Sequence, residues 1–320
     1  MPLLEIKNLK LDFVAGERSL RAVDDVSITI NAGETVCLVG ESGCGKSVTA
    51  LSIARLVPSP PARYVGGEIL LNGRDVLRMG KEELRGIRGG VVSYVFQDPS
   101  ASLNPVFRVG NQIKESLKLH RPEKATDAEV IRLLKLVGIP APESRIKDYP
   151  HQMSGGMQQR VMIAMALASE PKLLVADEPT TALDVTIQAQ ILDLLLDLKQ
   201  RLGMSILLIT HNLGIVGDMA ERVAVMYAGQ VVELSPAREL LKRPLHPYTK
   251  ALMNSVPKLT GNLERLLAIP GSVPTLGNFP PGCRFFPRCP SAHPECAATM
   301  PQLQEVEPNR WVRCLYPKEL

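Results

Sequence analysis

Apolar and polar residues alternate along the first thirty positions of the chain. Residues 4–9 and 26–30 each place every second side chain on an apolar face, as half-buried antiparallel strands do. A further short strand is predicted at 67–71, where an apolar run ends at the turn Asn72-Gly73. These runs predict a small antiparallel β subdomain.

The pattern changes to a helical period between about residues 100 and 170. Residues 130–137 and 161–168 carry apolar side chains at helical spacing, and proline-rich joints separate such segments. An apolar run at 91–96 comes directly before them. We therefore predict a helical insertion, at about 98–170, between strands of one core.

Short runs that are entirely apolar predict the buried strands of that core. They lie at 35–39, 173–176 and 205–210, and a helix of suitable length and spacing follows the second run at 187–202. Residues 223–226 and 230–234 indicate a hairpin joined through Ala228-Gly229. Strand–helix alternation predicts an α/β fold with a mostly parallel sheet, whose site lies at the carboxyl ends of the strands.

The strongest chemical signal follows the strand at 35–39. The chain there reads Gly-x-x-x-x-Gly-Lys-Ser, and a helix-compatible segment at 48–57 comes next. This strand–loop–helix context is typical of a phosphate-binding P-loop rather than of an ordinary glycine turn. Glycines let backbone N–H groups line an anion-sized hollow, and the helix start adds its own donors. The candidate nucleotide ligands here are Gly40, Ser42, Gly43, Cys44, Gly45, Lys46, Ser47 and Val48.

Within this loop, Lys46 can reach the β- and γ-phosphates, and Ser47 can place its hydroxyl on Mg²⁺. Asp177 and Glu178 close the apolar run at 173–176, where P-loop ATPases keep a magnesium-binding acid. Asp177 is predicted to hold Mg²⁺, and Glu178 to orient the attacking water. His211 follows the strand at 205–210 and is placed to meet the γ-phosphate. Alone, such residues are more often structural; together with a P-loop they predict ATP hydrolysis.

Composition narrows the class of protein. The chain has 320 residues, of which 45% are hydrophobic and 22% charged, as in globular proteins. A net charge of +4 from scattered Lys and Arg residues does not favour nucleic acid as a partner. We find no apolar run long enough to span a bilayer and no leader pattern at the N-terminus. We therefore expect a cytoplasmic protein that another protein holds at any membrane where it works.

The composition shifts at about residue 270. Ten of the 26 prolines, four of the six cysteines and the only tryptophan, Trp311, lie beyond it, without helical or strand periodicity. We predict an ATP-binding domain at 1–265 and an irregular Cys/Pro-rich region at 266–320. A region of this size and composition rarely folds alone without a stabilising cross-link such as a disulfide or a metal.

The tail cysteines have the spacing Cys-x5-Cys-x6-Cys-x17-Cys; they are Cys283, Cys289, Cys296 and Cys314. A cytosolic ATPase argues against disulfides. Zinc is possible, although structural zinc sites usually pair cysteines two to four residues apart. Four thiolates can also hold a [4Fe–4S] cluster, and free thiols are the third alternative. Of the other two, Cys37 is expected in the core and Cys44 at a variable P-loop position.

A further motif makes the resemblance specific. Ser154-Gly155-Gly156 lies ahead of the strand at 173–176, and Gln97 opens the helical insertion. With the P-loop, Asp177-Glu178 and His211, this order resembles the ATP-binding cassette of ABC transporters over residues 3 to about 250. The resemblance implies a P-loop NTPase cassette with an antiparallel β subdomain and a helical insertion, followed here by the Cys-rich region.

The resemblance also implies roles for single residues. Gln97 lies near Mg²⁺ and the face that meets a membrane subunit. Ser154, Gly155 and Gly156 form the signature that grips the γ-phosphate held by a second cassette. Asp184 lies at that dimer interface, His211 is the switch histidine, and Phe13 either stacks on adenine or belongs to the core. This chain has Met153 and Met157 where the family's signature usually has Leu and Gln, which leaves its full strength open.

Three stretches resemble the ATPases of dipeptide, oligopeptide and nickel importers: residues 96–105, 246–249 and the cysteine tail around 282–290. That family implies a second ATPase, often a paralogous chain, two transmembrane permease subunits and an extracytoplasmic binding protein. It implies a peripheral location at the cytoplasmic face of the inner membrane. It also implies the [4Fe–4S] cluster at the four tail cysteines.

We thus expect an ATP-hydrolysing importer subunit, most consistent with di- or oligopeptide uptake. Nickel or another solute of the same family is one alternative. A soluble ABC ATPase of DNA repair, translation or iron–sulfur assembly is another, although one P-loop and no sustained heptads speak against it. A regulatory module without turnover conflicts with Glu178 and His211.

Overall fold

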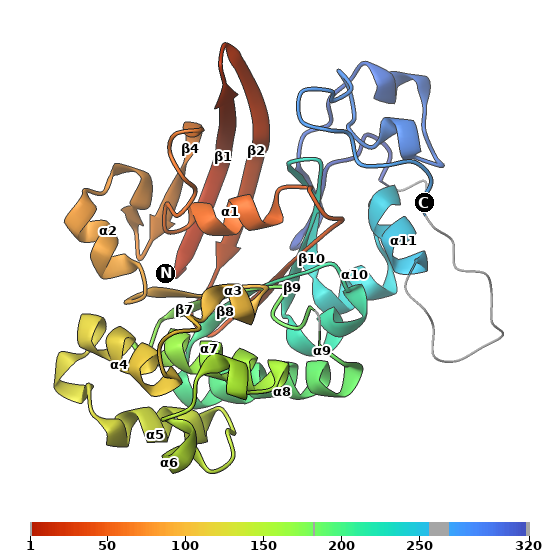
Figure 1. Cartoon of the computed structure of the whole chain (residues 1–320). Coiled ribbons are helices and arrows are strands. Elements are labelled where there is room, and N and C mark those ends of the chain that lie inside the picture. Colours follow the sequence, from red (N-terminus) through yellow and green to blue (C-terminus); the bar gives the residue numbers. More distant parts are fainter. Residues whose placement is uncertain (1, 182, 256–268, 318–320) are drawn as a thin grey trace. The chain divides into compact units, whose positions relative to one another are not determined.

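The computed structural model describes residues 2–181, 183–255 and 269–317 (Figure 1). The chain divides into two compact units, which are described one at a time. The first unit comprises Met1–Ile30, Thr35–Leu77 and Ile209–Leu320; the second comprises Asn31–Glu34 and Arg78–Leu208. The predicted boundary at 265/266 falls outside the described residues and stays a prediction.

An antiparallel sheet opens the first unit, with the strand order β2-β1-β4-β5. Its strands are β1 (Leu4–Ala15), β2 (Arg18–Ile30), β4 (Ala62–Leu71) and β5 (Arg74–Asp75). Leu4 lies opposite Ile30 and Phe13 opposite Leu20, so β1 and β2 form the long hairpin at the red end of Figure 1. The predicted antiparallel strands are confirmed, and both are longer than the alternating runs.

A second set of strands in the first unit has the order β11-β12-β10-β9-β3. They are β3 (Thr35–Val39), β9 (Arg222–Tyr227), β10 (Gln230–Pro236), β11 (Gln304–Glu307) and β12 (Arg310–Val312). β3 runs parallel to β9, and β9 pairs with β10 as the predicted hairpin.

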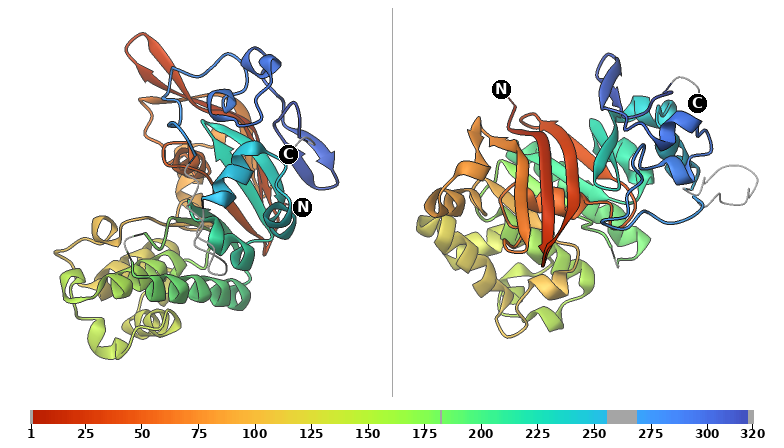
Figure 2. Two further views of the ribbon diagram at one scale, coloured as in Figure 1. Left: turned by 90° about the vertical axis from the view of Figure 1, so that its right-hand side faces the viewer. Right: turned by 90° about the horizontal axis from the view of Figure 1, so that it is seen from above.

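The prediction that the tail lacks strands is wrong at β11 and β12. They form a hairpin that pairs with β10, at the blue end of the chain in Figure 2. β12 pairs with β10, about 80 residues earlier in the chain. Local periodicity therefore gives no sign of these strands.

The helix after the P-loop is shorter than predicted. We expected it over 48–57, but α1 (Lys46–Ser52) ends three residues before Arg55, whose φ of 50° is left-handed. The other short helices of the first unit are α9 (Val216–Met219), α10 (Ala237–Lys242) and α11 (Pro247–Asn254). Single 3₁₀ turns lie at Val76–Arg78, which crosses into the second unit, and at Leu213–Ile215, Phe286–Arg288 and Pro294–Ala297.

The second unit contains the buried strands β6 (Val92–Val95) and β7 (Leu173–Asp177), which run parallel. Most of β8 (Ser205–Thr210) also belongs to it, next to β7. Its helices are α2 (Lys81–Ile87), α3 (Pro99–Ser102), α4 (Val109–His120), α5 (Asp127–Leu136), α6 (Pro142–Arg145), α7 (Gly155–Leu167) and α8 (Val185–Leu202), with 3₁₀ turns at Pro122–Lys124 and Pro150–Gln152. The structure shows helices through the range of the predicted insertion.

Helix starts and ends in this unit follow local chemistry. Thr126 caps α5 by accepting a hydrogen bond from the backbone N–H of Glu129. α8 buries Ile191, Leu195 and Leu198 at helical spacing and stops at Gly203, whose φ is 64°. Among the helices that the structure describes, none is long and apolar enough to cross a membrane.

Two glycines of the antiparallel sheet differ in the space available for a Cβ atom, which allows a matched pair of predictions. Gly67 and Gly73 both have positive φ, of 87° and 77°. A Cβ on Gly67 would lie 2.5 Å from the carbonyl oxygens of Lys7 and Asn8, whereas one on Gly73 meets nothing within 4 Å. Gly73→Ala should cost about 1–2 kcal/mol of unfolding free energy through backbone strain. Gly67→Ala should cost about 1–3 kcal/mol more through overpacking. Equal urea midpoints for the two variants would contradict this.

Candidate nucleotide site and a cysteine-lined pocket

The loop between β3 and α1 packs closely against β9 at Gly40 and against β9 and β2 at Gly45. Gly40 has a φ of 154°, and a Cβ there would lie 2.2 Å from the Met226 carbonyl oxygen. Gly45 has a φ of 104°, and its Cβ would lie 2.8 Å from the Met226 Cε and 3.0 Å from the Ala22 carbonyl oxygen. The glycine spacing of this loop is therefore imposed by close packing as well as by conformation.

Lys46 is the first residue of α1, and its side chain turns back onto this loop. Its ammonium donates hydrogen bonds to the carbonyl oxygens of Gly40, at 2.8 Å, and Glu41, at 3.1 Å. The side chain is only 5% exposed, whereas Ser47, the next residue, is exposed. The loop thus fixes the ammonium beside its own backbone and leaves the serine accessible, an arrangement suited to a phosphate and its metal ion.

In the second unit, the structure brings Gln97 and Glu178 together. The Gln97 amide donates to Glu178 Oε2 at 3.3 Å, and the Thr181 hydroxyl donates to the same oxygen at 3.0 Å. Glu178 follows the last residue of β7, Asp177, and has a φ of 47°, an uncommon conformation for a residue with a side chain. Two donors and a strained backbone hold this carboxylate in one place, as a general base requires.

The starts of α7 and α8 lie against each other in the same unit. Ser154 caps α7 by accepting from the Met157 N–H at 3.4 Å, and Asp184 caps α8 by accepting from the Ile187 N–H at 2.9 Å. A Cβ on Gly156 would lie 2.9 Å from Ile187 Cγ2. Asp184 therefore has a structural role at a helix start, which its sequence position alone did not reveal.

The two methionines that flank the predicted signature leave the capped start of α7 in place. Met153 is 6% exposed and occupies an apolar position that Leu also fills. At Met157 the group that bonds Ser154 is the backbone N–H, which does not depend on the side chain. The helix-start donors are therefore present in this chain.

The remaining predicted nucleotide residues are separated between the units. Phe13 is half-buried in β1, opposite Leu20 and Ala62, and belongs to the first unit together with His211, which is exposed after β8. Asp177 closes β7 in the second unit. Phe13 and His211 thus share a unit with the P-loop, and Asp177 shares one with Gln97 and Glu178.

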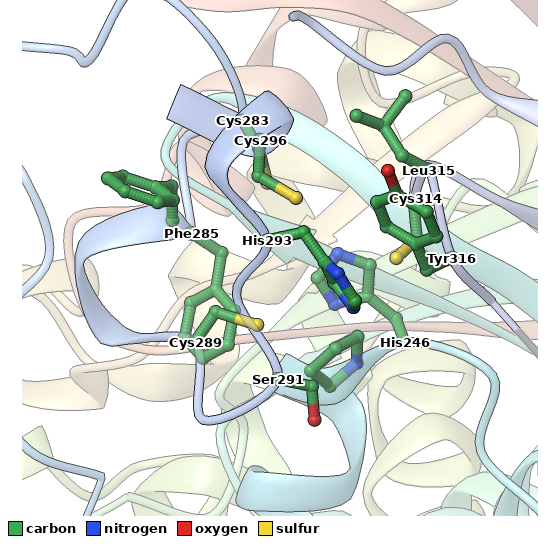
Figure 3. Close-up of a pocket in the computed structure, with 12 residues that line it drawn as sticks. His246, Cys283, Phe285, Cys289, Ser291, His293, Cys296, Cys314, Leu315 and Tyr316 are labelled. Carbon is green, nitrogen blue, oxygen red and sulfur yellow. The ribbon is translucent and has the colours of Figure 1, made fainter. Parts of the chain in front are cut away.

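A pocket in the first unit is lined by all four tail cysteines. Figure 3 shows Cys283, Cys289, Cys296 and Cys314 arranged around one space, with the ring of His293 among them. None of the four forms a disulfide with another described residue. Burial raises the pKa of the Cys283 and Cys289 thiols, and it raises the pKa of Cys314 to about 11.

Zinc and a [4Fe–4S] cluster would place the four cysteine sulfurs at different distances from one another. Among the described residues no three His, Cys, Asp or Glu side chains are grouped tightly enough to hold a metal ion. One zinc at about 2.3 Å from each sulfur would draw four sulfurs to within about 3.8 Å of one another. A cubane cluster carries its thiolates on separate irons and so holds them further apart. A pocket that all four cysteines line is compatible with either group. Either group requires thiolates, so its binding releases protons.

The stretch 246–249 links this pocket to α11. His246 Nδ1 accepts from the Tyr248 N–H at 3.0 Å and caps the helix, and Pro247 occupies its first turn. Burial lowers the pKa of His246 to about 3, which keeps the ring neutral, as an accepting Nδ1 requires. Sequence reasoning marked this stretch as a family signal but did not identify what it contacts.

Comparison with known proteins agrees with this architecture. The family model described as ABC transporter matches residues 23–181. A second model, oligopeptide/dipeptide transporter C-terminal region, matches residues 232–296. The structure is similar to the ATP-binding cassette MJ0796 in a dimeric post-hydrolysis state bound to ADP and Pi, with a TM-score of 0.65 and 29% identity. That similarity covers 73% of this chain and 99% of the cassette, so the fold is that of an ABC ATPase.

Two relatives are similar over their whole length. The oligopeptide transport ATP-binding protein AppD of Bacillus subtilis is 51% identical, over 99% of this chain and 98% of its own. The probable peptide ABC transporter ATP-binding protein y4tR of Sinorhizobium fredii is 49% identical, over 99% and 96%. The chain therefore belongs to the family of oligopeptide/dipeptide ABC transporter ATP-binding proteins.

Proposed function

We propose that this chain is the ATP-hydrolysing subunit of an importer for di- or oligopeptides. The observation that carries the proposal is the hydrogen-bonded pair Gln97–Glu178 in a chain that also has a complete P-loop and is half identical over its full length to peptide transport ATP-binding proteins. ATP binding and hydrolysis in this subunit would drive solute uptake through partner membrane subunits.

The proposed roles follow the geometry of each unit. Lys46 binds the β- and γ-phosphates, and the P-loop glycines bring backbone donors to them. Ser47, Gln97 and Asp177 are the residues that would hold Mg²⁺, which neutralises phosphate charge when bound. Glu178 takes the proton of the attacking water, and His211 contacts the γ-phosphate. Phe13 is the candidate for stacking on adenine. The other nucleotide ligands are Gly40, Ser42, Gly43, Cys44, Gly45 and Val48.

One cassette supplies half of each composite site. Ser154, Gly155 and Gly156 would bind the γ-phosphate held by a second cassette, with Asp184 at the same interface. The partners are therefore a second ABC ATPase, proposed to be a paralogous chain, two transmembrane permease subunits and an extracytoplasmic binding protein. The complex places this chain at the cytoplasmic face of the inner membrane as a peripheral subunit.

Recovery of those partners tests the proposal directly. Tagged chain extracted from membranes in mild detergent should carry two multi-spanning subunits and a second cassette, identified by mass spectrometry. Uptake of labelled peptides by cells should stop when the chain is deleted. Uptake of nickel instead would change the solute, and recovery of soluble partners alone would favour a non-transport ABC ATPase.

Glu178→Gln should separate binding from hydrolysis. Glutamine keeps an oxygen that accepts from Thr181 and Gln97 but cannot take a proton, so turnover should fall about 10²–10⁴-fold while ATP still binds. Lys46→Ala should instead lose nucleotide affinity. Glu82→Gln, at a side chain that is 82% exposed, is the matched control and should change neither quantity. Unchanged turnover in Glu178→Gln would refute the role of this carboxylate.

We also propose that Cys283, Cys289, Cys296 and Cys314 hold a [4Fe–4S] cluster with a structural role. The pocket that all four line and the resemblance of the tail to the importer family support it. Zinc is the alternative that the same four thiols allow.

Metal analysis of anaerobically purified protein distinguishes the two. We expect about four irons and about four acid-labile sulfides per chain. Cys289→Ser should lower both, whereas Cys44→Ser, which changes a buried P-loop thiol, should not. One zinc without iron would replace the cluster by the alternative. Absence of iron, sulfide and zinc would leave four free thiols and end the proposal.

A further inference from the structure

An arginine of the cysteine-rich region forms a salt bridge with a residue of the P-loop. The Arg288 guanidinium donates to both carboxylate oxygens of Glu41, the second residue of the loop, at 2.7 and 2.9 Å. Its Nε donates to the Pro270 carbonyl oxygen at 2.8 Å, and its charged group lies 5.7 Å from the centre of the Tyr227 ring. The arginine side chain is 4% exposed and thus has little freedom to leave this position.

The backbone of the same loop residue is held as well. The Glu41 N–H donates to the Tyr248 hydroxyl at 2.9 Å. Tyr248 is fully buried and lies 4.6 Å from Tyr227 and 5.3 Å from Phe285 between ring centres. Side chain and main chain of Glu41 are therefore both fixed by groups outside the loop. Because Glu41 also offers its carbonyl oxygen to Lys46, these contacts bear on the position of the phosphate-binding ammonium.

Three of the four pocket cysteines have such an arginine next to them in the sequence. Arg284 follows Cys283, Arg288 precedes Cys289, and Arg313 precedes Cys314. All three arginines are buried. A shift of the backbone at one of these cysteines would therefore also displace the neighbouring arginine and the hydrogen bonds that it makes.

The partners of the other two arginines lie in β2, in β10 and in the turn between β9 and β10. Arg284 donates to Asp24 and to the Ala228 carbonyl oxygen. Arg313 donates to Asp25 and to the Val231 carbonyl oxygen. The turn that Arg284 contacts reaches the P-loop, because the N–H after Ala228 donates to the Cys44 carbonyl oxygen at 2.8 Å. Two of the arginines thus act on the loop from different sides.

We propose that Arg288 is a positioning residue for nucleotide binding, through which the cysteine-rich region sets the affinity of the P-loop for ATP. It acts through Glu41 and touches no reacting atom. The inference deepens the proposed function and rests on the nucleotide role of residues 40–47. Coupling between two sites is reciprocal, so nucleotide should also stabilise the cysteine-rich region.

The first test compares two buried arginines of the same region. Arg288→Gln should weaken binding of a fluorescent ATP analogue by about tenfold. Arg310→Gln is the matched control, because Arg310 is equally buried but its partners are Glu307, the Arg243 carbonyl oxygen and, at 3.7 Å, Glu233, none of which belongs to the loop. It should lower the melting temperature without changing nucleotide affinity. Arg288→Lys, which keeps the charge and one donor direction, should recover part of the affinity.

A double-mutant cycle assigns the effect to the pair. Glu41→Gln should weaken binding about as much as Arg288→Gln, and the double variant should be little worse than either. Glu41→Gln also keeps the test decisive if Arg288→Gln fails to fold, because Glu41 lies in the loop and is partly exposed. Additive losses would mean that the two side chains act independently and would overturn the proposal.

Hydrogen exchange measures the reciprocal effect, that of nucleotide on the cysteine-rich region. ATP should slow amide exchange across residues 283–296 in the native protein, with its metal content unchanged, and this protection should disappear in Arg288→Gln. Native affinity in a folded Arg288→Gln, or equal losses in Arg288→Gln and Arg310→Gln, would overturn the proposal while leaving the ATPase assignment intact. Absence of nucleotide binding by the native protein would overturn both.

Discussion

The close approach of the P-loop to β9 constrains everything around it. At Gly40 a Cβ would overlap the Met226 carbonyl oxygen, so the loop must be glycine there and must follow one path. That path places the Lys46 ammonium against loop carbonyls and leaves Ser47 exposed. A loop so tightly fixed on one side still needs its other side held, and Arg288 and Tyr248 supply that support through Glu41.

Features with a local physical cause could be predicted from the sequence. β1 and β2 follow from alternation, β7 from a fully apolar run, and the loop after β3 from its glycines and lysine. Ser154 caps the start of α7, where a serine followed by two glycines is locally well suited. In each case the sequence pattern that signals the element lies within about ten residues, where periodicity and turn chemistry can be detected.

Features with a distant cause could not be predicted. Glu41 and Arg288 are 247 positions apart, and Glu41 and Tyr248 are 207 apart. No spacing rule relates them. The hairpin β11–β12 depends on pairing with β10, which outweighs a proline-rich composition. The early end of α1 depends on Arg55, whose left-handed backbone is not typical of arginine.

The buried arginines of the tail show why such contacts matter for more than stability. Burial lowers the pKa of Arg284, which means that removing its charge from water opposes folding. Hydrophobic residues of similar size would avoid that cost. A fork of donors, however, fixes direction as well as distance, and a bidentate pair such as Arg288 with Glu41 holds a carboxylate in one orientation. The tail therefore gains geometric control of the phosphate-binding loop from interactions that contribute little net stability.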